Sequence, residues 1–252
     1  MCVDGRVTQQ RNNSAESSPG PVAPSAPVAR SGYLYWVAKV VLTPILTVAF
    51  RPKVEGVRRV PRSGPAILAC NHVSYLDWLF LPLVVRTRRI SFLAKLEYFT
   101  RPGMKGAFQR YFFTATGQVP IDRSGTDSAS AALRTARRLL HEGRLVGVFP
   151  EGTRSRDGRL YRGRTGVARL AADTGVPVIP CATVGVFELA PPGTRVPRPR
   201  RIAMRFGAPM TWPAGRPTSP AELRTWTDEL MTEIQRLSGQ EAAGIDAWGP
   251  RS

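Results

Sequence analysis

The sequence predicts an α/β protein in which a mixed, largely parallel sheet is flanked by helices. From about residue 55 onward, short apolar runs of strand length recur, and helical patterns lie between several of them. The runs predicted as strands are Pro65–Cys70, Ile90–Ala94, Gln118–Ile121, Leu145–Phe149, Pro177–Val186 and Ile202–Phe206. With 252 residues, of which 42% are hydrophobic, the chain can bury the core of one such domain.

The chain divides into four parts by composition. Residues 1–31 are rich in Ser, Pro, Gly and Ala, so we expect a disordered tail without the apolar segment of a signal peptide. Residues 32–52 form a helical segment, residues 53–239 form the folded domain, and residues 240–252 are expected to be a second disordered tail.

The segment from Tyr33 to Phe50 is apolar but is not a clear membrane span. It contains one charge, Lys39, and one proline, Pro44, whereas a spanning helix needs about 20 apolar residues. Because proline breaks helices, we expect two short helices that lie in the membrane interface as an N-terminal anchor. A helix buried in the protein core is the alternative that the sequence leaves open.

Two later helices carry boundary signals. The first covers Asp127–His141, with apolar residues on one face, Gly143 just beyond its end, and Ser124 or Thr126 as its cap. The last helix begins at a capping box and ends before a glycine; its boundary residues are Ser219, Pro220, Glu222 and Gly239. Both helices carry an apolar stripe and are expected to pack on the sheet.

The charge balance is strongly basic. The chain has 36 Lys and Arg against 18 Asp and Glu, a net charge of +18, which favours anionic partners such as nucleic acid, an acidic membrane or a phosphorylated ligand. No zinc-finger spacing, RNP-like segment or helix-turn-helix pattern is present, so we expect no nucleic acid partner. Cys70 and Cys181 lie in apolar runs without CxxC spacing, which indicates buried thiols in a reducing, cytosol-facing environment.

The first motif with catalytic potential is NHVSYLD, residues 71–77, which follows the apolar run that ends at Cys70. Strand ends are where α/β proteins present side chains to a ligand. The His72 imidazole can accept a proton at neutral pH, and Asp77 can hold the ring and stabilise the imidazolium. Positions five apart do not share a helix face, so the pair needs His72 in a turn and Asp77 in the first helical turn. An exposed histidine beside a helix-capping aspartate remains the alternative.

The second motif is FPEGTRS, residues 149–155, again at the end of an apolar run. Gly152 allows the backbone to approach a ligand closely, and Arg154 offers a planar fork that suits phosphate oxygens. Glu151 can accept a hydrogen bond from a ligand hydroxyl or orient Arg154. A polar β-turn with an exposed salt bridge is the alternative.

These two motifs in this order resemble those of the glycerolipid acyltransferases, in particular the 1-acyl-sn-glycerol-3-phosphate acyltransferases. Four further segments strengthen the resemblance, which covers roughly residues 33 to 238: FLAKLEYF with Lys95, GQVPIDR with Arg123, VPVIP at 176–180 and RFGAP at 205–209. Pro120 and the basic run 195–201 depart from the family pattern. The resemblance implies the family's α/β acyltransferase domain over residues 53–239, preceded by the helical membrane anchor.

The resemblance also implies roles for single residues. His72 is expected to be the general base and Asp77 its orienting partner. The residues expected to line the acceptor's phosphate are Lys95, Arg123, Glu151, Gly152, Thr153 and Arg154.

The implied reaction moves a fatty acyl group from acyl-CoA or acyl carrier protein to the sn-2 hydroxyl of lysophosphatidate. A thioester is already activated, so we expect no metal, no cofactor and no covalent enzyme intermediate. The expected location is the cytosolic face of the cell membrane, on an anionic surface, as a peripheral or monotopic protein. Another acceptor, such as glycerol-3-phosphate, a lysophospholipid or an amino-acid lysolipid, stays open, as do a lipid-binding protein without catalysis and the oligomeric state.

Overall fold

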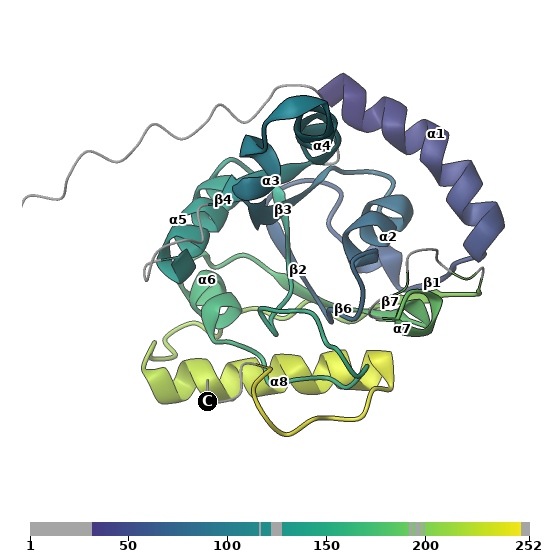
Figure 1. The fold of residues 1–252 in the computed structure, drawn as a ribbon. Helices are drawn as coiled ribbons and strands as arrows, with labels where there is room; N and C mark the ends of the chain where they lie inside the picture. Colours follow the sequence, from purple (N-terminus) through teal and green to yellow (C-terminus); the bar gives the residue numbers. More distant parts are fainter. Residues whose placement is uncertain are drawn as a thin grey trace, which may run out of the picture.

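The computed structural model describes residues 32–115, 117–121, 128–191, 194, 198 and 200–247, and their centre is a seven-stranded sheet (Figure 1). The strand order is β1-β7-β6-β2-β5-β3-β4. The strands are β1 (Lys53–Glu55), β2 (Ala66–Cys70), β3 (Ile90–Lys95), β4 (Gln118–Ile121), β5 (Leu145–Val148), β6 (Val178–Val184) and β7 (Ala203–Phe206). The predicted tail at residues 1–31 and the predicted caps Ser124 and Thr126 lie outside the described residues.

Strand direction confirms the predicted mixed and largely parallel sheet. Every neighbouring pair is parallel except β6 and β7, which are antiparallel. Strands β2 to β6 therefore share one direction, and β1 and β7 run the opposite way. The carboxyl ends of five strands consequently meet at one edge of the sheet.

Helices cover both faces of this sheet (Figure 1). Buried side chains of α2 and α7 share one core layer with β2 and β3, while those of α5, α6 and α8 share the other with the opposite face of β2 and β5. The helices are α1 (Gly32–Phe50), α2 (Asp77–Val84), α3 (Glu97–Thr100), α4 (Gly103–Ala115), α5 (Ser128–His141), α6 (Gly166–Thr174), α7 (Val186–Leu189) and α8 (Pro220–Ser238), with a short 3₁₀ helix at Val57–Arg59. The predicted α/β fold is thus confirmed.

Helix α1 corrects one expectation. It is a single helix of 19 residues with Pro44 inside it, not two short helices. Pro44 is exposed, and Leu46 and Phe50 beyond it pack against the core, which stabilises the helix after the proline. Within the part of the chain that the structure describes, no helix is long and apolar enough to cross a bilayer.

The only charged side chain of α1 faces the protein body. Lys39 Nζ donates a hydrogen bond of 2.6 Å to the Val85 carbonyl oxygen, and burial, with the nearby Arg86, lowers the pKa of Lys39 to about 8. The large apolar side chains on the outer side of α1 are exposed: Trp36, Val37, Val40, Val41, Ile45 and Val48. Helix α1 therefore presents an apolar surface without a charge, which we call the outer face of α1.

The last helix ends as its sequence predicts. The Ser219 side chain accepts a hydrogen bond from the Glu222 N–H, and Gly239 ends α8 in a left-handed conformation with φ of 71°. Gly143 follows α5 with φ of 74°, also as expected.

The predicted disordered tail from residue 240 is wrong for its first part. Leu160 N–H donates to the Glu241 carbonyl at 2.9 Å, Ala243 N–H donates to the Leu160 carbonyl at 2.8 Å, and Arg162 N–H donates to the Ile245 carbonyl at 3.1 Å. The small, polar composition of this segment resembles that of a tail, but its backbone pairs with the loop that follows the second motif. Residues 248–252 lie outside the described residues.

Candidate active site

The two motifs meet at the carboxyl edge of the sheet because the strands that precede them are parallel neighbours. Strand β2, which leads to His72, pairs with β5, which leads to Glu151, with Ala69 opposite Val148. Strand β3, which ends at Lys95, pairs with the other side of β5. Motifs nearly eighty residues apart in sequence are therefore brought together by strand order alone.

The predicted catalytic pair is formed. His72 Nδ1 lies 2.9 Å from Asp77 Oδ2, His72 lies in the turn after β2, and Asp77 is the first residue of α2. The Asp77 side chain is fully buried and that of His72 is 20% exposed. Because Asp77 Oδ2 acts as an acceptor, Nδ1 carries the hydrogen of a neutral ring, and Nε2 keeps a lone pair for a substrate proton.

Asp77 is held by more than the imidazole. Its Oδ2 also accepts hydrogen bonds of 2.8 Å from the backbone N–H groups of Val73 and Ser74. Its Oδ1 accepts one of 3.0 Å from the Thr183 hydroxyl, at the end of β6. Thr183 is not among the residues predicted from the sequence, although a hydroxyl near the carboxyl end of an otherwise apolar strand is a usable signal.

An aromatic stack supports the His72 ring. The ring lies on Phe149 with centroids 4.0 Å apart and 16° between the planes, and Phe149 stacks on Phe92 at 5.8 Å. Phe92 lies over Gly147, where an added Cβ would meet the Phe92 ring at 2.2 Å. The stack thus needs a glycine in β5, and this requirement was not apparent from the sequence.

Glu151 lies behind the site. It is 1% exposed; Oε1 accepts from the His72 N–H at 2.8 Å and Oε2 accepts from the Tyr161 N–H at 3.0 Å. The His72 carbonyl in turn accepts from the Ser155 N–H at 2.7 Å, so the second motif holds the His72 backbone from both sides. The expectation that Glu151 lines the acceptor's phosphate does not fit this geometry, because backbone donors occupy both oxygens.

Burial raises the pKa of Glu151 to about 7, although the two backbone N–H groups oppose this shift. The negative charges of Asp77 and Asp157 raise it further. The carboxyl group therefore changes its protonation state near neutral pH, directly behind the backbone of His72.

The remaining residues of the second motif are more accessible. Gly152 and Arg154 are exposed and Thr153 is half-buried. Gly152 has φ of 74°, and an added Cβ would meet the Arg164 side chain at 3.0 Å, so both its conformation and its neighbour favour glycine. Arg154 directly precedes Ser155, whose N–H donates to the His72 carbonyl, so an arginine lies next to the turn that carries His72.

Two predicted phosphate ligands cannot be placed. Lys95 is the last residue of β3 and pairs with Ile121, but its side chain lies outside what the structure describes. Arg123 lies wholly outside the described residues. Among those residues, the structure brings together no group of three or more His, Cys, Asp and Glu side chains that could hold a metal ion.

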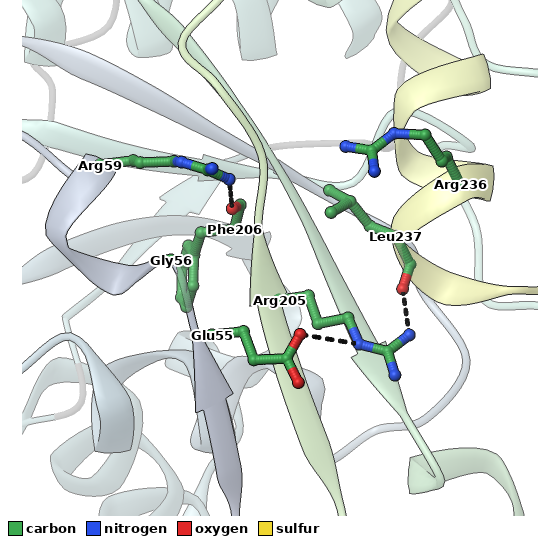
Figure 2. A pocket seen from close by; sticks show the side chains of 7 residues that line it. All are labelled: Glu55, Gly56, Arg59, Arg205, Phe206, Arg236 and Leu237. Atoms are coloured by element: carbon green, nitrogen blue, oxygen red, sulfur yellow. Dashed lines mark hydrogen bonds and ion pairs between the residues drawn. The ribbon is translucent and has the colours of Figure 1, made fainter.

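A separate hollow of about 410 Å³ lies beside α8 and β1, and its lining contains none of the predicted site residues (Figure 2). Two of its arginines join elements of the fold: Arg205 donates to the Leu237 carbonyl at 2.8 Å and pairs with Glu55 at 3.5 Å, and Arg59 donates to the Phe206 carbonyl at 2.7 Å. Arg205, from the late RFGAP segment, therefore joins β7 to β1 and α8.

A histidine with a buried carboxylate partner lies beside an arginine-bearing loop at the carboxyl edge of an α/β sheet, an arrangement typical of enzymes that use a histidine base. Residues 51–184, which include both motifs, match the family described as Acyltransferase. This match covers more than half of the 252 residues, and the chain belongs to the acyltransferase family.

Two similar proteins carry the same printed activity. The chain is 31% identical over 166 residues to a chloroplastic 1-acyl-sn-glycerol-3-phosphate acyltransferase of Arabidopsis thaliana, covering 66% of this chain and 45% of that protein. It is 30% identical over 142 residues to the 1-acyl-sn-glycerol-3-phosphate acyltransferase of Bacillus subtilis, covering 56% of this chain and 66% of that protein. The chain thus matches less than two thirds of the length of either relative.

A solved structure extends the likeness to the fold. The crystal structure of the 1-acyl-sn-glycerophosphate acyltransferase from Thermotoga maritima is similar with a TM-score of 0.58 and 27% identity. The similarity covers 80% of this chain and 82% of that one.

Proposed function

We propose that this protein transfers a fatty acyl group from an acyl thioester to the sn-2 hydroxyl of 1-acyl-glycerol-3-phosphate. The observation that carries the proposal is the contact of 2.9 Å between His72 Nδ1 and Asp77 Oδ2, which leaves Nε2 as the proton acceptor. The choice of lysophosphatidate as acceptor is supported by the names of the Arabidopsis and Bacillus relatives.

The reaction follows from this geometry. Nε2 of His72 takes the proton of the acceptor hydroxyl as the hydroxyl oxygen attacks the thioester carbonyl carbon. The buried Asp77 carboxylate stabilises the imidazolium, and when the carbon–sulfur bond breaks, the imidazolium returns the proton to the leaving thiolate. General-base assistance of this kind contributes about 10²–10⁴-fold in rate.

Acceptor binding is assigned to the accessible part of the second motif. Arg154 binds the acceptor's phosphate with its planar guanidinium, and Gly152 and Thr153 form the wall beside it. Lys95, the last residue of β3, and Arg123, which follows β4 in the sequence, remain proposed ligands of the same phosphate. Glu151 supports the site through the His72 backbone.

The outer face of α1 provides contact with a membrane. Its exposed apolar side chains carry no charge, and Lys39 is turned inward, so the helix can lie in the bilayer interface while the net charge of +18 attracts anionic lipid. We place this contact at the cytosolic face of the cell membrane. Flotation with vesicles of phosphatidylglycerol and phosphatidylcholine tests it: the protein should float with them, and Val40→Asp with Val48→Asp should stay behind. Equal flotation of the double variant would show that another surface binds the membrane.

The direct test of the catalytic proposal uses the only two histidines of the chain. Lysophosphatidate in vesicles is offered with acyl-CoA or with acyl carrier protein, and the phosphatidate formed is measured. His72→Ala should lose at least about 10³-fold in kcat, because the base is removed. His141→Ala, an exposed residue at the end of α5, is the matched control and should retain activity. Equal activity of the two variants would exclude His72 as the base.

The same assay decides between acceptors and between donors. Glycerol-3-phosphate, lysophosphatidylcholine and an amino-acid lysolipid are supplied in place of lysophosphatidate. We expect lysophosphatidate to have the highest kcat/KM of these acceptors. A higher value for another acceptor would keep the chemistry and change the substrate.

A further inference from the structure

The Thr183 side chain is buried at the site but belongs to neither motif. It lies near the end of β6, is 2% exposed, and its hydroxyl oxygen is 3.0 Å from Asp77 Oδ1. Asp77 itself is completely buried. A buried hydroxyl aimed at a buried carboxylate is a charge-assisted hydrogen bond, which is stronger than one between neutral groups.

The position of Thr183 is fixed by an unusual pairing. After Cys70, the β2 chain leaves the sheet to form the His72 turn, so the backbone of Thr183 loses its neighbour in β2. The Asn71 side chain replaces it: Thr183 N–H donates to Asn71 Oδ1 at 2.8 Å, and Asn71 Nδ2 donates to the Thr183 carbonyl at 3.0 Å. The buried backbone groups of Thr183 are thereby satisfied. Its hydroxyl oxygen lies 3.0 Å from Asp77 Oδ1 and 3.3 Å from Asn71 Oδ1. The single hydroxyl hydrogen goes to the shorter contact, because that acceptor is a carboxylate.

Asn71 is in turn held by the segment after α8. Asn71 Nδ2 donates to Gln240 Oε1 at 2.7 Å, and Gln240 Nε2 donates to the Gly158 carbonyl at 2.7 Å. A continuous set of hydrogen bonds therefore runs from the C-terminal segment through Asn71 and Thr183 to Asp77.

The two oxygens of Asp77 are served unequally. Oδ2 accepts from the His72 ring and from two backbone N–H groups, whereas Thr183 is the one donor to Oδ1 that the structure shows among the described residues. Without the hydroxyl, a buried anionic oxygen lacks this donor and the carboxylate rotates or relaxes to find another. Any such movement carries the His72 ring with it, because Oδ2 sets the ring orientation.

We propose that Thr183 is a positioning residue for the acyl transfer: its hydroxyl fixes the Asp77 carboxylate so that His72 Nε2 faces the acceptor hydroxyl. The effect on rate rests on the function proposed above, whereas the effect on the His72 ring does not.

The test compares two buried threonines that lose the same hydroxyl. Thr183→Val should lower kcat about tenfold, with KM for both substrates within about twofold, because a hydrogen bond to a charged group is removed without touching either substrate. Thr183→Ser should recover most of kcat. Thr227→Val is the matched control, since Thr227 is also buried but donates to the Leu223 carbonyl in α8 at 2.7 Å. It should keep kcat while losing a comparable amount of thermal stability.

Three results would overturn the proposal: Thr183→Val with the kcat of Thr227→Val, a change in KM instead of kcat, or no recovery with serine. The NMR signal of the His72 Nδ1 hydrogen provides a readout without substrate, and it should shift in Thr183→Val and stay in place in Thr227→Val. If wild type transfers no acyl group to any acceptor, the proposed function fails, and this signal still decides the role of Thr183.

Discussion

Each of the two motifs contributes one buried carboxylate at the carboxyl edge of the sheet, and the two carboxylates hold different groups of His72. Asp77 from the first motif faces the His72 ring at 2.9 Å, whereas Glu151 from the second motif faces the His72 backbone N–H at 2.8 Å. In the proposed reaction, the partner of the first, the His72 ring, becomes a cation. The second has neutral N–H partners, and burial raises its pKa to about 7. A buried carboxylate can thus hold the ring of the proposed base, as Asp77 does, or the backbone that carries that ring, as Glu151 does.

Of the substitutions at these two carboxylates, Asp77→Asn is expected to cause the larger loss of kcat. The amide that replaces one oxygen cannot favour the Nδ1–H tautomer or stabilise an imidazolium, so kcat should fall about 10³–10⁴-fold. Steady-state kinetics with lysophosphatidate measures this loss. Asp173→Asn is the control, because Asp173 lies in α6 and pairs with Arg137. A loss below about tenfold in Asp77→Asn would mean that Asp77 serves the helix start rather than the histidine.

Much of this site could be predicted from the sequence. The motifs placed His72 and Asp77 correctly, because a turn followed by a helix start is a local pattern. Their meeting with Glu151 also followed from the rule that parallel strands end at one edge. The capping box at Ser219 and Glu222 predicted the start of α8 for the same local reason.

What was missed depends on contacts between distant segments. The Phe92–Phe149–His72 stack needs Phe92 opposite Gly147, a register that no local pattern contains. Thr183 reaches Asp77 only because β6 lies beside β2. Strand β1 has only three residues, which is too short for a pattern in the sequence. Helix α1 continues past Pro44 because residues beyond the proline pack against the core, and this packing has no signal in the local sequence.

Arg154→Ala tests the accessible half of the second motif and should have an intermediate effect. An exposed guanidinium that binds the acceptor's phosphate contributes mainly to binding, so KM for lysophosphatidate should rise about tenfold while kcat changes less. Kinetics at saturating acyl donor measures this separation. Arg156→Ala, two residues further along the same exposed loop, is the control. A fall in kcat at constant KM would instead place Arg154 with the groups that stabilise the transition state.

Glu151→Gln tests the buried half and should have the smallest effect on rate. Glutamine keeps one acceptor oxygen, so one of the two N–H groups, that of His72 or that of Tyr161, loses its partner. Because only one hydrogen bond is weakened, kcat should fall by roughly a few-fold. The informative measurement is the free energy of unfolding against pH, by urea denaturation. In the folded protein the pKa of Glu151 is raised from 4.5 to about 7. The contribution of Glu151 to the free energy of unfolding is therefore complete below pH 4.5 and is lost as the pH rises through 7.

Relative to Glu151→Gln, the free energy of unfolding of wild type should therefore fall by about 3 kcal/mol between pH 4.5 and pH 7. Glu55→Gln is the control with the opposite sign. The Lys53 side chain lowers the pKa of Glu55, so that carboxylate contributes above the unfolded pKa and its contribution is lost as the pH falls. A flat difference for Glu151→Gln from pH 4.5 to 7 would mean that this carboxylate stays charged throughout. In that case its two backbone hydrogen bonds outweigh burial.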